Sequence, residues 1–349
     1  MDTIGIFLWG LGTVGVELAK LALNKEGVKI VGIVDEDKNK IGKDLGDILS
    51  IEKTNIIISD PKENLIDKVD ADVVILSTKS QIKSIFTVVK DILKSKKNCI
   101  TIAEEMVYPY CVEPELSIKI DELAKENNVT ILGTGVNPGF ILDSLIITLS
   151  STCNKIRKIT AERINDLSDF GLESMKFQGV GTTLEEFEKG IDDGEIVGHI
   201  GFLQSISMIV DTLGIDYDEI IESKEPIISN TYRTANGIEV EPGMVAGCNH
   251  VAIAYKNGKE IVVLEMVNQI YPQSEAIDTG DYINIYCEND LHFSIKSGIQ
   301  GIKGTALLAL NMIPQVVASE SGLKTMVDMK NPHAIENNFI DQLKYYKKL

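Results

Sequence analysis

The sequence predicts an α/β protein with a Rossmann-type doubly wound parallel sheet, followed by a second α+β domain with a mainly antiparallel sheet. Three observations lead to this prediction. A glycine-rich motif follows the first apolar strand, short apolar strands alternate with helical patterns over the first 140 residues, and strand pairs joined by tight turns follow after about residue 150. Alternating strands and helices are typical of parallel sheets, whereas short turns between strands are typical of antiparallel ones.

The first part of the chain alternates between two apolar patterns. Apolar runs of strand length predict buried strands at residues 4–9, 28–34, 55–58, 73–76, 99–103 and 129–132. Apolar residues spaced three and four apart predict helices over residues 14–22, 82–93 and 116–123. Because parallel strands need crossover connections, we expect these helices to cover both faces of one parallel sheet.

The second part has strand patterns of period two. Residues 156–165 predict a strand, and helices are expected over 183–189 and 198–213. Two hairpins are predicted, residues 251–267 around Asn257-Gly258 and residues 282–295 around Asn289-Asp290. Apolar side chains at alternate positions predict a sheet with one solvated face. The last helix, over residues 304–318, is apolar almost all round and is expected to be buried.

Composition excludes several classes of partner. The 349 residues include 34 basic and 52 acidic side chains, and a formal net charge of −18 argues against a nucleic-acid partner. The apolar runs are shorter than the roughly 20 residues that span a bilayer, so no membrane partner is expected. Five scattered cysteines without a CxxC pair, and no signal peptide, favour a reducing cytoplasm.

The glycine motif is typical of dinucleotide binding. Its first glycine, Gly10, permits a tight turn, and its second, Gly12, allows close approach of a pyrophosphate. Its third, Gly15, allows close packing of helix and strand. Asp35 ends the second strand, where a carboxylate binds the ribose hydroxyls of NAD. Lys38 and Lys40 lie nearby, which leaves NADP possible as well. The motif consists of Gly10, Leu11, Gly12, Thr13, Val14 and Gly15.

Two further segments are expected to contact the cofactor, because ligands bind beyond the carboxyl ends of parallel strands. Ser77 and Thr78 end the fourth strand, although their hydroxyls also suit a helix cap. Asn137 and Pro138 lie in a Gly-, Asn- and Pro-rich loop after the sixth strand, where Asn137 suits the nicotinamide carboxamide. A plain turn is the alternative for this loop.

The fifth strand ends in two carboxylates, Glu104 and Glu105, at the place expected for the nicotinamide ring. A carboxylate suits a cationic substrate such as an ammonium group, since it can accept a proton and later activate water. Adjacent side chains diverge, so we expect only one of them to face the ring and favour Glu104. The alternative is a solvated acidic pair that caps a neighbouring segment.

Three residues of the second part are candidates for substrate binding. Arg163 and Asn165 lie on one face of a strand, and arginine is the best partner for a carboxylate. His199 precedes an apolar helix between two glycines. A structural ion pair is the alternative for Arg163, and a structural histidine for His199. The sequence lacks HExxH, GxSxG and P-loop motifs, and it predicts no metal site.

Together, residues 10–15, Asp35, residues 103–109 and residues 133–140 resemble the 2,4-diaminopentanoate dehydrogenases. These enzymes belong to a dihydrodipicolinate-reductase-like group that also contains native amine dehydrogenases. The resemblance runs over nearly the whole chain. It implies NAD(P)-dependent oxidative deamination of 2,4-diaminopentanoate to 2-amino-4-oxopentanoate and ammonia, in ornithine degradation. An amine dehydrogenase for another amine or diamino acid, or a non-catalytic NAD-binding sensor, are the alternatives.

We therefore expect three segments. Residues 1–145 form an NAD(P)-binding domain, residues 146–302 a substrate and oligomerisation domain, and residues 303–349 a C-terminal helical segment. This segment is expected to pack on the first domain or at a subunit interface. A symmetric homodimer is the expected assembly, because the second sheet has one solvated face and the final long helix is apolar.

Overall fold

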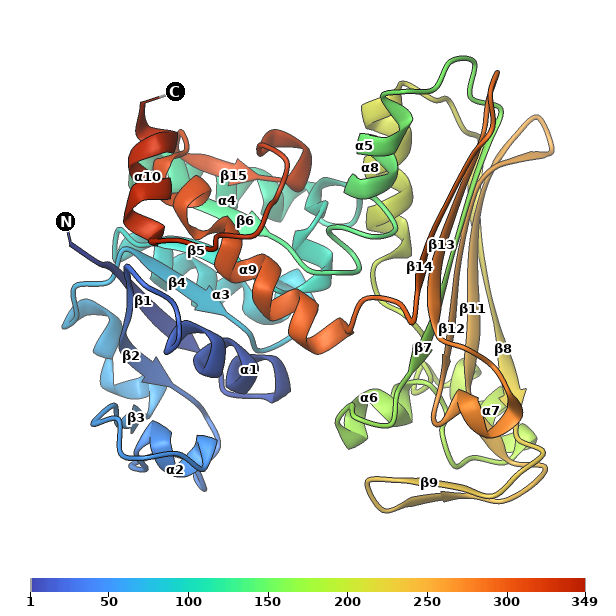
Figure 1. The fold of residues 1–349 in the computed structure, drawn as a ribbon, viewed down its shortest axis with the longest axis horizontal. Coiled ribbons are helices and arrows are strands. Elements are labelled where there is room, and N and C mark those ends of the chain that lie inside the picture. Colours follow the sequence, from blue (N-terminus) through green and yellow to red (C-terminus); the bar gives the residue numbers. More distant parts are fainter. Residues whose placement is uncertain (1, 349) are drawn as a thin grey trace. The chain divides into compact units, whose positions relative to one another are not determined.

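The computed structural model describes residues 2–348, and the chain divides into two compact units (Figure 1). Unit 1 comprises the chain up to Phe140 and from Gly301 onward, and unit 2 comprises Ile141–Gln300. The first boundary falls five residues before the expected one, because Asp143 accepts a 2.9 Å hydrogen bond from the Ser205 hydroxyl of unit 2. The second falls at the start of the long C-terminal helix.

Unit 1 contains a parallel sheet of seven strands, in the order β15-β6-β5-β4-β1-β2-β3. This confirms the predicted doubly wound sheet. The three-residue strand from the C-terminal segment was not predicted, because it is too short to show a pattern. The strands are β1 (Ile4–Trp9), β2 (Val28–Val34), β3 (Ile58–Ser59), β4 (Val73–Leu76), β5 (Asn98–Thr101), β6 (Thr130–Gly133) and β15 (Gly322–Lys324).

Helices cover both faces of this sheet, as the alternating strand side chains require. One buried apolar cluster joins the sheet to α1, α9 and α10, and a second joins the opposite face to α3 and α4. The helices of unit 1 are α1 (Thr13–Ala22), α2 (Leu45–Leu49), α3 (Ile82–Lys94), α4 (Pro114–Glu126), α9 (Gly301–Ala318) and α10 (Phe339–Lys347). The 3₁₀ turns are η1 (Pro61–Glu63), η2 (Leu65–Asp67), η3 (Glu104–Met106), η4 (Pro109–Cys111) and η6 (Met326–Asp328).

The long apolar helix α9 returns to unit 1, one of its two expected positions. It packs against α1 and α10, and its buried residues include Leu310, Ile313 and Val316. Among the described residues it alone is long and apolar enough to cross a membrane by length and composition. Its apolar surface is explained by its place in the core of unit 1.

Unit 2 is built on a six-stranded sheet in the order β14-β13-β7-β12-β11-β8. The sheet is mixed, because β7 and β12 pair in parallel whereas the other neighbours are antiparallel. The edge strand β8 was not predicted, since its charged residues interrupt the apolar alternation. The strands are β7 (Lys158–Asp166), β8 (Glu219–Ile228), β11 (Val245–Lys256), β12 (Lys259–Gln269), β13 (Gly280–Tyr286) and β14 (Leu291–Lys296), with a separate hairpin of β9 (Arg233–Ala235) and β10 (Ile238–Val240).

The helices of unit 2 leave one sheet face partly exposed. Figure 1 shows α5 and α8 side by side along the long strands, and α8 contacts β11 and β12. Side chains at alternate positions of β11 and β12 are buried, and those between them are partly exposed. The elements are α5 (Ser144–Ser150), α6 (Leu172–Phe177), α7 (Leu184–Asp192), α8 (Phe202–Leu213) and the turn η5 (Pro272–Glu275).

Turn geometry separates a correct prediction from a wrong one. Asn257 and Gly258 have φ of 51° and 70°, as a primed hairpin turn requires.

Helix α8 was predicted to begin at Gly198 but begins at Phe202. Gly198 and Gly201 have φ of 68° and 131°, values that an α-helix does not contain.

Candidate active site

The glycine motif forms the connection between β1 and α1 in unit 1. Gly10 has φ of 100°, and a Cβ on Gly15 would lie 2.2 Å from the Gly10 carbonyl oxygen. A Cβ on Gly12 would meet nothing within 4 Å, so the loop is open in front of this residue. Tight packing at Gly15 and open space at Gly12 before the helix N-terminus fit a dinucleotide pyrophosphate.

Asp35 lies at the carboxyl end of β2 and is tied to the glycine loop. Its Oδ2 accepts a 2.6 Å hydrogen bond from the Leu11 amide, and its Oδ1 accepts one of 2.7 Å from the Asp37 amide. Lys40 donates to the Leu11 carbonyl at 2.9 Å and lies 3.8 Å from Asp35 Oδ2. The carboxylate therefore orders the loop, and a lysine cation lies beside it.

Ser77 and Thr78 follow β4 and face the same loop. The Ser77 amide donates to the Trp9 carbonyl at 2.8 Å, and its hydroxyl donates to the Gly10 carbonyl at 2.9 Å. The Thr78 methyl would lie 2.9 Å from a Cβ on Gly10. Neither residue caps α3, since Gln81 holds the N-cap position without a side-chain hydrogen bond.

Glu104 and Glu105 begin the 3₁₀ turn η3 directly after β5, and their side chains have different partners. Glu105 Oε2 accepts a 2.8 Å hydrogen bond from the Ile82 amide, the first residue of α3. The Glu104 carboxyl group accepts a hydrogen bond from the Ser80 hydroxyl. The sequence allowed either a catalytic carboxylate or a pair that caps a neighbouring segment. Glu105 caps the start of α3, whereas Glu104 does not and is therefore the candidate for catalysis.

Burial raises the pKa of the Glu104 carboxyl above its ordinary value. The Ser80 hydrogen bond opposes this rise in pKa, and the negative charge of Glu105 adds to it. A carboxylate with a raised pKa is a stronger proton acceptor, which is the property that general-base chemistry near neutral pH needs.

The loop after β6 contains Asn137 and Pro138, joined by a cis peptide bond. Two backbone amides fix the loop to its neighbours in unit 1. The Thr134 amide donates to the Thr101 carbonyl of β5 at 2.9 Å, and the Val136 amide donates to the Thr305 hydroxyl of α9 at 3.2 Å. The loop is thus held at the same edge of the sheet as the tips of β1, β2, β4 and β5.

Arg163 of β7 is buried in an ion pair within unit 2. Its Nη1 lies 3.0 Å from Asp281 Oδ1, and its Nε donates to Asn165 Oδ1 at 3.0 Å. Its Nη2 donates to the Ile299 carbonyl. Only 1% of Arg163 is exposed. This arrangement is the structural ion pair that the sequence left open as the alternative, and it occupies the guanidinium group that was expected to bind the substrate.

His199 lies before α8 with its ring edge against Phe202, at a centroid distance of 4.9 Å. Its backbone amide donates to His250 Nδ1 at 3.0 Å, which leaves His250 Nε2 to donate to Glu222 at 3.0 Å. Burial, together with the positive charge of Arg163, lowers the pKa of His199 to about 3. The His199 imidazole is therefore neutral at physiological pH.

Sequence reasoning missed two residues of these clusters. Ser80 carries no motif, because it meets Glu104 only through the packing of β4 beside β5. Asp281 lies opposite Arg163 in the β7–β13 register, a signal visible only once the strand pairing is known. Among residues 2–348, no group of three His, Cys, Asp or Glu side chains is placed to hold a metal ion.

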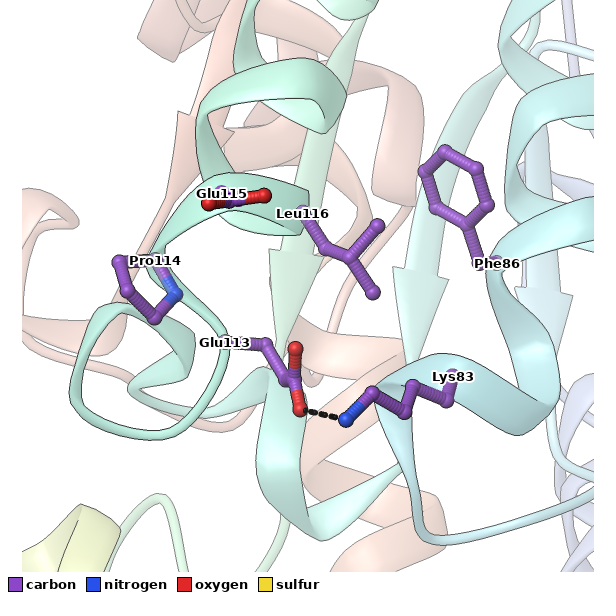
Figure 2. Close-up of a pocket in the computed structure, with 6 residues that line it drawn as sticks. All are labelled: Lys83, Phe86, Glu113, Pro114, Glu115 and Leu116. Carbon is purple, nitrogen blue, oxygen red and sulfur yellow. Dashed lines mark ion pairs between the residues drawn. The ribbon is translucent and has the colours of Figure 1, made fainter.

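An open pocket with a volume of about 560 Å³ lies between α3 and the start of α4, and Figure 2 shows the residues that line it. Phe86 and Leu116 supply apolar walls, and Lys83 forms a 2.5 Å ion pair with Glu113 across it. None of the residues predicted to bind cofactor or substrate lines this pocket. It is therefore separate from the candidate active-site residues.

Known proteins resemble the chain over nearly its full length. The 2,4-diaminopentanoate dehydrogenase C-terminal domain matches residues 140–345, and the dihydrodipicolinate reductase N-terminal domain matches residues 4–101. The chain is 38% identical to the 2,4-diaminopentanoate dehydrogenase of Acetoanaerobium sticklandii, over 98% of this chain and 97% of that protein.

Two solved structures show the same fold. The amine dehydrogenase from Mycobacterium smegmatis has a TM-score of 0.86 at 24% identity, and covers 96% of this chain and 98% of its own. A probable dehydrogenase from Thermotoga maritima has a TM-score of 0.57 at 13% identity, and covers 93% and 92%.

The Arg163–Asp281 pair yields a prediction about stability. Arg163→Met leaves Asp281 buried without its counter-charge, which costs about 3–5 kcal/mol of unfolding free energy. The further change Asp281→Asn should recover much of this loss. Arg157→Met, which removes the exposed pair with Asp290, is the control and should cost about 1 kcal/mol or less. Urea unfolding at pH 7 measures these values. Full stability of Arg163→Met with a raised substrate KM would contradict the structural role.

Proposed function

This chain belongs to the 2,4-diaminopentanoate dehydrogenase family and is an NAD(P)-dependent dehydrogenase, and on that premise we propose that it oxidatively deaminates 2,4-diaminopentanoate. The products are 2-amino-4-oxopentanoate and ammonia. The observation that carries the proposal is a carboxylate of raised pKa, Glu104, directly after β5. A proton acceptor at this position suits an ammonium substrate, which must lose a proton before hydride can leave its carbon.

We propose that NAD is held at the carboxyl edge of the unit 1 sheet, with NADP as a possible second cofactor. The glycine loop and the N-terminus of α1 would bind the pyrophosphate, and Asp35 the ribose hydroxyls. When bound, the nicotinamide supplies the acceptor for the hydride from substrate C4. The remaining proposed contacts come from Ser77, Thr78, Asn137 and Pro138.

Glu104 would act twice in the reaction. It first accepts a proton from the C4 ammonium group, so that the nitrogen lone pair can assist departure of the hydride. Glu104 then releases this proton to solvent. The iminium ion left by hydride departure needs water at C4, and the ionised Glu104 orients this water, accepts its proton to give the carbinolamine, and later returns the proton to the amino nitrogen. The carbinolamine then collapses to the ketone and ammonia. Glu105 is not proposed as the base, because its carboxylate is engaged at the start of α3.

The neutral His199 and Asn165 are proposed as hydrogen-bonding groups for the substrate. A neutral imidazole can accept a hydrogen bond from an ammonium group, whereas a charged one would repel it. Asn165 donates to Asn268 at 3.0 Å and accepts from Arg163, and the charge of Arg163 also acts on His199.

One observation favours a second candidate, an amine dehydrogenase for a different amine or diamino acid. The arginine expected to hold the substrate carboxylate is already paired with Asp281. A panel of amines and amino acids, followed by absorbance of the reduced cofactor, separates the two candidates. Preference for a simple amine over 2,4-diaminopentanoate would favour the second. A non-catalytic sensor would reduce no cofactor with any of them.

We propose that the protein acts in the cytoplasm, in ornithine degradation, where the proposed substrate would arise. Loss of growth on ornithine after deletion of the gene would support the role in ornithine degradation. Normal growth of the deletion strain with unchanged ornithine consumption would contradict it.

The partly exposed face of the unit 2 sheet supports a homodimer. Its strands carry apolar side chains such as Val251, Ile253 and Val263 beside Glu265. Two copies that associate through the same face form a dimer with two-fold symmetry, which is the commonest symmetry of homo-oligomers. Sedimentation at micromolar concentration should give twice the mass of the 38.3 kDa chain, and a monomer would contradict the proposal.

Cofactor choice can be tested at Asp35. Asp35→Ser removes the charge that repels a 2′-phosphate, so the ratio of kcat/KM for NADP to that for NAD should rise. Asp37→Ser changes the net charge equally two residues along the chain and should alter this ratio much less. An unchanged ratio in Asp35→Ser would mean that Asp35 does not contact the ribose.

The base can be tested at Glu104. Glu104→Gln keeps the shape of the side chain but removes its basicity, so kcat should fall by about 10²- to 10⁴-fold. The Kd for NAD should stay near normal, because the glycine loop is untouched. Glu105→Gln keeps an oxygen acceptor for the Ile82 amide and should lower the maximal kcat by less than about tenfold. Wild-type kcat in Glu104→Gln would place the base elsewhere.

A further inference from the structure

The segment between β4 and α3 is tied to both glutamates of η3. Its Ser80 carbonyl accepts a 3.1 Å hydrogen bond from the Glu105 amide, and its Ser80 hydroxyl donates to the Glu104 carboxyl group. At its end, the Ile82 amide donates to Glu105 Oε2 at 2.8 Å. Three hydrogen bonds, two of them to carboxyl groups, thus join a stretch of three residues to two adjacent glutamates.

These contacts place the two carboxylates in different electrostatic settings. Glu105 lies at the N-terminus of α3, a helix of 13 residues, where the helix dipole favours negative charge. Glu104 accepts hydrogen bonds from the neutral Ser80 hydroxyl and from its own backbone amide, and it has the negative charge of Glu105 as its neighbour. A donor stabilises the ionised form of a carboxyl group, whereas a nearby like charge favours the protonated form.

Other charged groups around this pair are accounted for within unit 1. Lys83 of α3 interacts with Glu105 but forms its own ion pair with Glu113 at 2.5 Å. Strand β6, which packs against η3, has the sequence Thr-Ile-Leu-Gly and carries no titratable side chain. The charge that acts on Glu104 from η3 and its neighbours in unit 1 is therefore that of Glu105.

We propose that Ser80 and Glu105 are positioning residues for Glu104: Ser80 holds its carboxyl group, and Glu105 is itself held next to it by the Ile82 amide and the Ser80 carbonyl. Ser80 keeps the carboxylate ionised and oriented. Glu105, anchored at the helix N-terminus, makes ionisation less favourable. The inference rests on the proposed role of Glu104 as the base, and it explains why two adjacent acidic residues occupy one strand tip.

The opposed directions make the inference testable by kcat measured against pH. With saturating NAD and 2,4-diaminopentanoate, the rate should fall at low pH as Glu104 becomes protonated. Ser80→Ala removes the donor, so the midpoint of this acid limb should move to higher pH. Glu105→Gln removes the like charge but keeps an acceptor for the Ile82 amide, so the midpoint should move to lower pH. The substrate is the same throughout, so its own ionisation cancels in the comparison.

Two further variants serve as controls. Ser80→Thr keeps a hydroxyl donor and should restore the wild-type midpoint, which a merely structural defect at position 80 would not do. Glu104→Gln tests the underlying base and should lose most of its activity at every pH. At a pH below both midpoints, kcat of Glu105→Gln should exceed that of Ser80→Ala by about tenfold for each pH unit between their midpoints.

The outcomes separate the two proposals. Inactive Glu104→Gln, with midpoints that stay fixed or move together in Ser80→Ala and Glu105→Gln, overturns the positioning roles and leaves the base in place. Active Glu104→Gln with a wild-type acid limb overturns the base itself. If Ser80→Ala fails to fold, Glu105→Gln alone still tests the inference. An acid-limb midpoint that stays at the wild-type pH or moves to higher pH in Glu105→Gln contradicts it.

Discussion

The carboxyl ends of parallel strands all lie at one edge of the sheet, and this constraint brings the candidate active-site residues of unit 1 to the same edge. The tip of β1 becomes the glycine loop, β2 ends at Asp35, β4 ends before Ser77, and β5 ends before Glu104. None of these residues is near the others in sequence, yet all follow strands that pair in register. At the same edge, α3 begins where it can anchor Glu105, which leaves Glu104 with the Ser80 hydroxyl. The partly buried Glu104 carboxylate is therefore the one of this pair that is available for proton transfer.

The sequence contained enough information for most of the fold. Apolar runs of strand length placed β1, β2 and β4 at their observed residues, because buried parallel strands show little else. The elements that were missed have weak local patterns. Strand β15 has three residues, and β8 is an edge strand in which charged side chains interrupt the alternation. Their pairing is decided by neighbouring strands, which no local window of sequence describes.

The candidate site was predictable where a motif fixes the backbone. The glycine loop and its approach to Asp35 follow from residue type and spacing. The partners of charged side chains did not follow. Arg163 pairs with Asp281 across the β7–β13 register, 118 residues further along the chain, and Ser80 meets Glu104 through neighbouring strand tips. These contacts decide whether a charged side chain is structural or free for chemistry, and they depend on strand pairing.

The carboxylate after β5 is proposed to serve amine rather than alcohol oxidation. The most direct test incubates the purified protein and NAD with 2,4-diaminopentanoate or with its 4-hydroxy analogue, 2-amino-4-hydroxypentanoate. Absorbance of the reduced cofactor and released ammonia are measured together. If Glu104 serves amine oxidation, the cofactor is reduced with the diamine only, and one ammonia is released for each cofactor reduced. Comparable oxidation of the hydroxy compound, or cofactor reduction without ammonia, would contradict it.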